Sequence, residues 1–169
     1  DLEKITSASK YLLNLINNVL DLSKVEANRM TLYLEDFNVS LLIKEVVSTI
    51  QPLVKKNNNI LEVEIQPEVQ AMYADSTKVR QVLYNLLSNA CKFTKEGKIT
   101  LQVQSLQQND IEYIRFSVID TGIGLTEEQL EKLFQKYAQA DASIARDYGG
   151  TGLGLVLTQQ FCNMMGGSV

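Results

Sequence analysis

Apolar and polar residues follow two periods along this chain, one typical of helices and one typical of strands. Residues 1–28 have the helical period, and no glycine or proline interrupts it. The apolar positions of this segment, near heptad spacing, are Leu2, Ile5, Leu12, Leu13, Ile16, Val19, Leu20 and Val25. Because such an apolar stripe must be covered, the helix packs either on its own domain or in a bundle or dimer whose other helices lie elsewhere.

Helical spacing predicts three more long helices, and the segment Thr126-Glu-Glu-Gln129 matches a capping box that opens a shorter one. The four helices are expected over about residues 40–56, 75–93, 126–137 and 153–165. Residues 138–150 are polar and poor in long apolar side chains, so we expect a mobile loop between the last two helices.

Alternation by two predicts five short strands. They are expected at residues 31–34, 60–65, 71–74, 98–106 and 111–119. The last two are expected to form an antiparallel hairpin through residues 107–110. Helices together with an antiparallel-rich sheet predict an α+β fold, a two-layer sandwich with the helices on one face of the sheet.

The composition excludes several classes of function. The 169 residues are 45% hydrophobic, which is enough for one full core and a small appendage. The net charge of −4 and a pI near 4.9 argue against a nucleic-acid surface, which needs a basic stripe. No basic block adjoins an apolar helix, and no apolar run approaches the roughly 20 residues of a membrane span, so we expect a soluble segment without direct membrane contact.

Histidine is absent, and cysteine occurs only twice, at Cys91 and Cys162. These residues cannot build an ordinary zinc site. Any metal ion is therefore expected to be a hard cation with oxygen ligands.

Two glycine motifs about 25 residues apart indicate a nucleotide site. Neither fits the more familiar glycine loops. A P-loop needs Gly-Lys-Ser/Thr after its spacer, whereas Gly154 is followed by Leu155 and Val156. A dinucleotide fingerprint that began at Gly122 would need a glycine at position 127, where Glu127 stands.

The first motif is Asp120-Thr-Gly122-Ile-Gly124, directly after the apolar strand that ends at Ile119. A carboxylate in this position is desolvated unless it finds a donor. The exocyclic amine of adenine is a suitable donor, and glycines allow a ring to approach the backbone closely. Asp120 is therefore predicted to bind adenine, with Gly122 and Gly124 beside it.

The second motif, Gly150-Thr151-Gly152-Leu153-Gly154, opens the last predicted helix. Free backbone N–H groups and the positive end of the helix dipole suit phosphate oxygens. This loop is therefore predicted to bind the phosphates.

A polar stripe on the helix over 75–93 completes the site. Asn85, Asn89 and Lys92 have the spacing i, i+4 and i+7, so they share one face of this helix. Asparagine oxygens can bind Mg²⁺ whose remaining ligands are phosphate and water, and a lysine can neutralise phosphate charge. Phe93 belongs either to the core or to the wall of the base pocket.

The motifs resemble those of the catalytic ATP-binding domain of sensor histidine kinases. They occur in the family's order, Asn85-Leu-Leu-x-Asn89-Ala-x-Lys-Phe93, Asp120-x-Gly-x-Gly124, Leu133-Phe-x-x-Tyr137 and Gly149-Gly-Thr-Gly-Leu-Gly-Leu155. The similarity covers residues 38–169, and residues 1–28 look like the second helix of the family's dimerisation and phosphotransfer hairpin. We therefore expect a partial dimerisation helix over 1–30 and an ATP-binding domain over 31–169.

The resemblance implies a Bergerat-type sandwich that binds ATP and Mg²⁺, with Asn89 as a Mg²⁺ ligand and Asn85 nearby. It further implies that residues 138–150 form a lid over ATP, that Phe134 and Tyr137 anchor this lid, and that Arg146 contacts the γ-phosphate. The implied partners are a second copy of the chain, bound through the N-terminal helix, and the receiver domain of a response regulator. The implied location is the cytoplasm, with a parent protein that can be membrane-anchored.

The chain departs from this family in two ways. It contains no histidine that could accept the phosphoryl group, and it stops at Val169, where the family continues into one or more further strands. We expect the acceptor histidine and those strands to lie outside this sequence, so no catalytic residue is assigned within it.

Two other functions stay open. The first is a Bergerat-fold ATPase, but such ATPases have a glutamate four residues before the Mg²⁺-binding asparagine, where this chain has Asn85. An amide cannot take a proton from water, which disfavours hydrolysis. The second is a non-catalytic, kinase-like module that binds partners.

Overall fold

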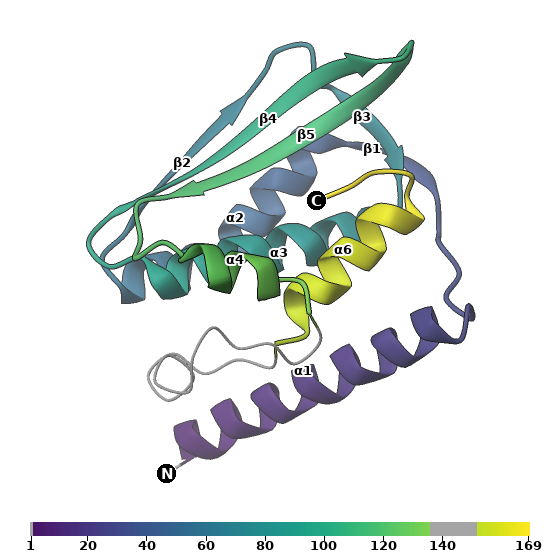
Figure 1. Ribbon diagram of the computed structural model, residues 1–169. Helices are drawn as coiled ribbons and strands as arrows, with labels where there is room; N and C mark the ends of the chain where they lie inside the picture. Colours follow the sequence, from purple (N-terminus) through teal and green to yellow (C-terminus); the bar gives the residue numbers. More distant parts are fainter. Residues whose placement is uncertain (1, 136–151) are drawn as a thin grey trace.

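The computed structural model describes residues 2–135 and 152–169. A three-stranded sheet forms one layer, helices α2, α3 and α6 lie against one of its faces, and the long helix α1 runs beneath those helices (Figure 1). The predicted fold class, an α+β sandwich with helices on one side of the sheet, is confirmed.

The sheet has the order β2-β4-β5, formed by Ile60–Ile65, Lys98–Gln108 and Ile111–Asp120. β4 and β5 are the predicted hairpin, but its turn consists only of Asn109 and Asp110, both at positive φ. β2 pairs with β4 in parallel, so the sheet is mixed. A separate two-stranded sheet pairs β1 (Glu35–Asn38) with β3 (Ala71–Ala74).

Helices α2 and α3 begin directly after capping side chains. Asn38 accepts the N–H of Leu41 at the start of α2 (Val39–Lys56), and Asp75 accepts the N–H of Lys78 at the start of α3 (Ser76–Phe93). Their apolar faces meet the inward side chains of β4 in the main core. The fully buried residues of this core include Val39, Ile43, Val46, Ile50, Leu83, Leu87, Ile99, Leu101 and Val103.

A second, smaller core joins α1 (Leu2–Glu26) to α6 (Gly154–Met164) and α3. Leu22 of α1 is buried there beside Leu157 and Phe161 of α6. An adjacent polar contact places the Lys78 ammonium 3.5 Å from the Asp21 carboxylate and 4.3 Å from the centroid of the Phe161 ring. One side of α1 is thus packed on its own domain.

The other side of α1 is apolar and exposed in this chain. Its exposed apolar side chains are Ile5, Leu12, Leu13, Ile16, Val19 and Leu20. The packed side of the helix agrees with the first interpretation of the N-terminal stripe, and its pairing with further helices stays a prediction.

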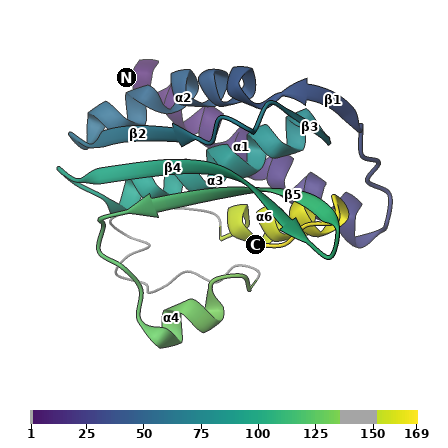
Figure 2. The same ribbon diagram turned by 90° about the horizontal axis from the view of Figure 1, so that it is seen from above.

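Two predicted elements differ from the structure. Residues 31–34 are not a strand, because the ladder with β3 begins only at Glu35. The capping box is confirmed, since Thr126 accepts the N–H of Gln129 and Gln129 accepts the N–H of Thr126, but α4 ends at Lys132 (Glu127–Lys132). α4 buries none of its residues and projects from the body of the domain (Figure 2).

The predicted mobile loop over 138–150 lies outside the described residues. Within the described part of the chain, no helix is both long and apolar enough to cross a membrane.

Candidate functional site

The polar stripe of α3 faces the beginning of α6. The Asn85 side chain donates from Nδ2 to the carbonyl of Gly154 at 3.1 Å and lies 3.5 Å from the hydroxyl of Thr158, which is fully buried. An ideal Cβ built on Gly154 would lie 3.6 Å from Cγ of Asn85. The amide nitrogen of Asn85 is therefore engaged within the protein, and Oδ1 is its remaining polar atom.

Asn89 and Lys92 lie further along the same helix, and both are half-buried. The side chain of Asn89 has no hydrogen-bond partner among the described residues, so its amide is available to a ligand. The Lys92 ammonium lies 4.8 Å from the centroid of the Phe93 ring. Burial lowers the pKa of Lys92 below its ordinary value, because the charged form loses hydration.

Phe93 itself is half-buried, and its backbone carbonyl accepts the N–H of Ile123 at 3.3 Å. Neither described core cluster includes it. It therefore lies at the junction between α3 and the first glycine loop.

Asp120 is the last residue of β5, and its register partner on β4 is the core residue Ile99. It continues the inward-facing series of Ile114, Phe116 and Val118, so its carboxylate lies on the helix side of the sheet. The expected desolvation is wrong, since Asp120 is exposed. Its Oδ1 accepts the N–H of Gly122 at 2.8 Å, so the carboxylate has a donor within its own loop.

Different constraints favour glycine at the two positions of this first loop: close contacts at Gly122 and a positive φ at Gly124. A Cβ on Gly122 would lie 2.5 Å from the Phe93 carbonyl oxygen and 2.7 Å from Oδ1 of Asp120, so no larger residue fits without a shift. Gly124 has open space around it but a φ of +68°, which L side chains rarely adopt.

The second glycine loop is described only in part. Gly152 has a φ of +67°, Leu153 is fully buried in the small core, and Gly154 is the first residue of α6. Four predicted residues, Tyr137, Arg146, Gly150 and Thr151, lie outside the described residues. Phe134 is described and is half-buried.

α3 thus connects the two glycine loops. Its middle contacts Gly154 through Asn85, and its carboxyl end contacts the Asp120 loop through Phe93 and Thr94. From Asn85 to Thr94 the helical rise gives a separation of about 13 Å. The polar side chains Asn89 and Lys92 lie between these two contacts.

Three residues that contribute to this arrangement were not predicted. Thr94 has its hydroxyl 3.5 Å from Oδ1 of Asp120, Asn59 binds the backbone around Thr94, and Thr158 lies beside Asn85. The only sequence signals were a threonine directly after the helix over 75–93 and an asparagine at the end of the run Asn57–Asn59.

The predicted site offers side-chain amides and one ammonium group on α3. Within the described residues, no three His, Cys, Asp or Glu side chains gather as a metal site would require.

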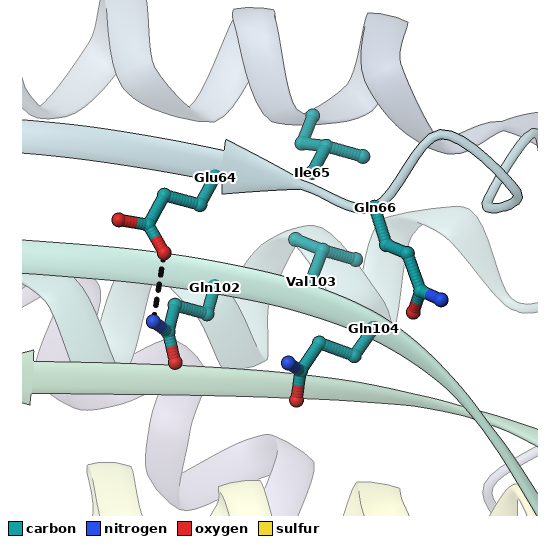
Figure 3. Close-up of a pocket in the computed structure, with 6 residues that line it drawn as sticks. All are labelled: Glu64, Ile65, Gln66, Gln102, Val103 and Gln104. Atoms are coloured by element: carbon teal, nitrogen blue, oxygen red, sulfur yellow. Dashed lines mark hydrogen bonds between the residues drawn. The ribbon is translucent and has the colours of Figure 1, made fainter.

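A pocket of about 260 Å³ lies elsewhere, at the carboxyl end of β2 and the middle of β4 (Figure 3). It is lined by Glu64, Ile65, Gln66, Gln102, Val103 and Gln104. Glu64 accepts a hydrogen bond from Gln102 across it at 2.7 Å. None of the predicted site residues lines it, so we do not assign the function to this pocket.

Several known proteins with similar sequences or folds are histidine kinases. The chain is 40% identical over 171 aligned residues to the circadian input-output histidine kinase CikA of Synechococcus elongatus. That match covers 99% of this chain but 22% of CikA, so the chain spans about a fifth of that relative's length.

Two solved structures share the fold. Full-length ShkA in complex with AMPPNP matches with a TM-score of 0.81 and 27% identity, over 95% of this chain and 32% of ShkA. The histidine kinase ThkA in complex with the response regulator protein TrrA matches with a TM-score of 0.71 and 27% identity, over 96% of this chain and 43% of the matched chain.

A family match covers the part of the chain that contains α3 and both glycine loops. Residues 74–169 match the family described as histidine kinase-, DNA gyrase B-, and HSP90-like ATPase. The chain belongs to this family, and its ATP-binding domain is of the sensor histidine kinase type.

Proposed function

We propose that this chain is the part of a sensor histidine kinase that binds ATP and presents its γ-phosphoryl group to a histidine elsewhere in the longer protein. The arrangement of α3 carries this proposal, because one helix places amide and ammonium groups between a carboxylate loop and a glycine loop. The domain belongs to a family of ATP-binding proteins. Its contribution to the reaction would be positioning and electrostatic stabilisation of the phosphates.

The Asp120 loop is the proposed adenine site. Oδ1 of Asp120 is engaged by the N–H of Gly122, so Oδ2 is the oxygen that remains to accept the exocyclic amine. Gly122 and Gly124 leave the backbone without side chains beside that carboxylate, so a planar ring can approach.

The start of α6 and the stripe on α3 form the proposed phosphate site. Gly152 and Gly154 would offer backbone N–H groups, and Lys92 would supply positive charge. Leu153 would hold this loop to the core by its buried side chain. Gly150, Thr151 and Arg146 are proposed to complete the phosphate contacts from the lid side.

Asn89 fits a Mg²⁺ ligand, since its half-buried amide has no side-chain partner in the described structure. Oδ1 of Asn85 is a second available oxygen, because Nδ2 is used by Gly154. Mg²⁺ bound there would neutralise phosphate charge between the two asparagines and the triphosphate.

Direct ATP hydrolysis is disfavoured by the same contacts. Asn85 stands where an ATPase would need a base, and its nitrogen already donates to Gly154. With no histidine in the sequence, the phosphoryl group must go to an acceptor outside this chain. We place the reaction in the cytoplasm, where ATP is available.

We further propose that residues 1–30 belong to a dimerisation bundle and residues 31–169 to the catalytic domain. The exposed apolar side of α1 would meet a second copy of the chain. A receiver domain would then accept the phosphoryl group, as supported by the solved complex of ThkA with a response regulator.

Calorimetry with saturating Mg²⁺ tests the proposal. The chain should bind ATP, Asp120→Asn should weaken that binding severely, and Asn89→Ala should remove its Mg²⁺-dependent part. ATP turnover by the isolated chain should be slow. Rapid turnover would favour an ATPase, and a folded chain that binds no nucleotide would favour a non-catalytic binding module.

A further inference from the structure

Thr94 is the first residue after α3, and its side chain is completely buried beside the Asp120 loop. Its hydroxyl oxygen lies 3.5 Å from Oδ1 of Asp120, at the long end of the range for a hydrogen bond. Contacts of this kind in ligand-free sites often shorten when the ligand binds. Thr94 thus contacts the carboxylate from the protein interior.

The backbone around Thr94 is fixed by a buried asparagine. Asn59, just before β2, donates from Nδ2 to the Thr94 carbonyl at 2.8 Å, and its Oδ1 accepts the N–H of Gly97 at 3.0 Å. The N–H of Thr94 donates to the carbonyl of Ala90, closing the helix. A Cβ on Gly97 would lie 2.6 Å from the Thr94 methyl group, so the side chain is also packed tightly.

The same oxygen of Asp120 receives both internal donors. Gly122 N–H lies 2.8 Å from Oδ1, and the Thr94 hydroxyl approaches Oδ1 from the helix side. A Cβ on Gly122 would lie 2.9 Å from the Thr94 hydroxyl, so the three groups are in mutual contact. Both internal donors thus lie on Oδ1, and Oδ2 is the carboxylate oxygen that receives neither of them.

We propose that Thr94 is a positioning residue for the purine subsite, whose hydroxyl holds Oδ1 of Asp120 so that Oδ2 meets the exocyclic amine of the base. This inference rests on the proposed binding of adenine by Asp120. Thr94 would act through the carboxylate, without contacting the nucleotide. Its contribution should therefore depend on whether the ligand has an amine for Asp120 to accept.

The test compares ATP with purine riboside 5′-triphosphate, which lacks the 6-amino group, by calorimetry with saturating Mg²⁺. Thr94→Val removes the hydroxyl and keeps the shape, and Thr94→Ser restores a hydroxyl. We expect Thr94→Val to weaken ATP binding by roughly fivefold, as for the loss of one ordinary hydrogen bond, and to leave binding of the analogue unchanged. Thr94→Ser should bind ATP nearly as the unaltered chain does.

Thr100→Val is the matched control. Thr100 is a buried threonine on β4, but it follows Ile99, the register partner of Asp120, and so faces the opposite side of the sheet. This variant should keep the full preference for ATP. Circular dichroism would verify folding, and Thr94→Ala replaces Thr94→Val if the valine variant does not fold.

The outcomes distinguish a failure of the role of Thr94 from a failure of the adenine assignment of Asp120. If Thr94→Val weakens both ligands equally, or weakens neither, the positioning role is overturned while Asp120 keeps its assignment. If the unaltered chain binds both triphosphates equally, Asp120 does not accept the amine, and the adenine assignment falls together with the role of Thr94.

Discussion

The side-chain amide of Asn85 donates a hydrogen bond of 3.1 Å to the backbone carbonyl of Gly154, 69 residues further along the chain. This bond joins the middle of α3 to the first residue of α6. Asn89, one helical turn later, makes no comparable contact within the described structure. The side chain of Asn85 therefore holds two helices together, whereas the side chain of Asn89 does not contribute to packing in this way.

That difference predicts different costs of mutation. Asn85→Ala should lower the free energy of unfolding by about 1–2 kcal/mol, because a half-buried carbonyl loses its donor. Asn89→Ala should change it by less than about 0.5 kcal/mol. Urea unfolding of the ligand-free chain measures both values, and equal losses would contradict the contact between α3 and α6.

The run Asn57–Asn59 offers a second matched pair. Asn59→Ala removes the buried amide that binds Thr94 and Gly97, and it should cost about 2–3 kcal/mol of stability. Asn58 is exposed with a φ of +52°, so Asn58→Gly should cost nothing or stabilise slightly. Thermal unfolding of the two variants would compare them, and a stable Asn59→Ala variant would show that water replaces the lost bonds.

Docking of α1 depends on Leu22, which is 5% exposed in the small core. Leu22→Ala should cost about 2–3 kcal/mol and release the carboxyl half of α1, since Leu22 is the apolar side chain by which the described part of α1 is buried in this core. Hydrogen exchange of the α1 amides would report the release. Leu12→Ala is the control, because Leu12 is 56% exposed, and its substitution should leave protection of the monomeric chain unchanged.

The lowered pKa of Lys92 leads us to expect that ATP binding depends on pH. Its folded-state pKa lies below the ordinary 10.5, because burial penalises the charged form. The buried charge of Lys92 therefore destabilises the ligand-free fold at low pH. This cost decreases as the pH rises above the folded-state pKa, and it is gone above the pKa of the unfolded chain. Phosphate charge would raise the pKa again, so ATP binding should take up protons in that alkaline window.

Calorimetry at about pH 9 in two buffers of different ionisation enthalpy would detect the proton uptake, since free phosphates are already ionised there. Lys92→Met should abolish the difference between the buffers. An unchanged difference in this variant would assign the protons to another group.

Local signals made the helices predictable from sequence. Asn38, Asp75 and Thr126 each cap the helix that follows, and capping depends on residues within one turn. The strand predicted at 31–34 is wrong, because local signals carry no information about which distant segment a strand pairs with. Residues 31–34 alternate between apolar and polar side chains, but the strand Ala71–Ala74 pairs with Glu35–Asn38 instead. Tyr33, outside this pairing, is 83% exposed.

The site was predictable where side chains carry distinctive chemistry at regular spacing. Asn85, Asn89, Lys92 and Asp120 meet that condition. Thr94 and Asn59 do not, because their contacts join residues 26 and 35 positions apart and involve ordinary residue types. The parallel pairing of β2 with β4, which brings Asn59 next to Gly97, could not be read from alternation alone.

The helices cover one side of the β2-β4-β5 sheet and leave the polar side with Glu64, Gln102 and Gln104 open (Figure 3). Asp120 and the α3 stripe belong to the covered side. A nanobody raised against Gln102 and Gln104 could therefore tether this molecule to a sensor chip in one orientation. Nucleotides in the flow would still reach the immobilised protein unhindered.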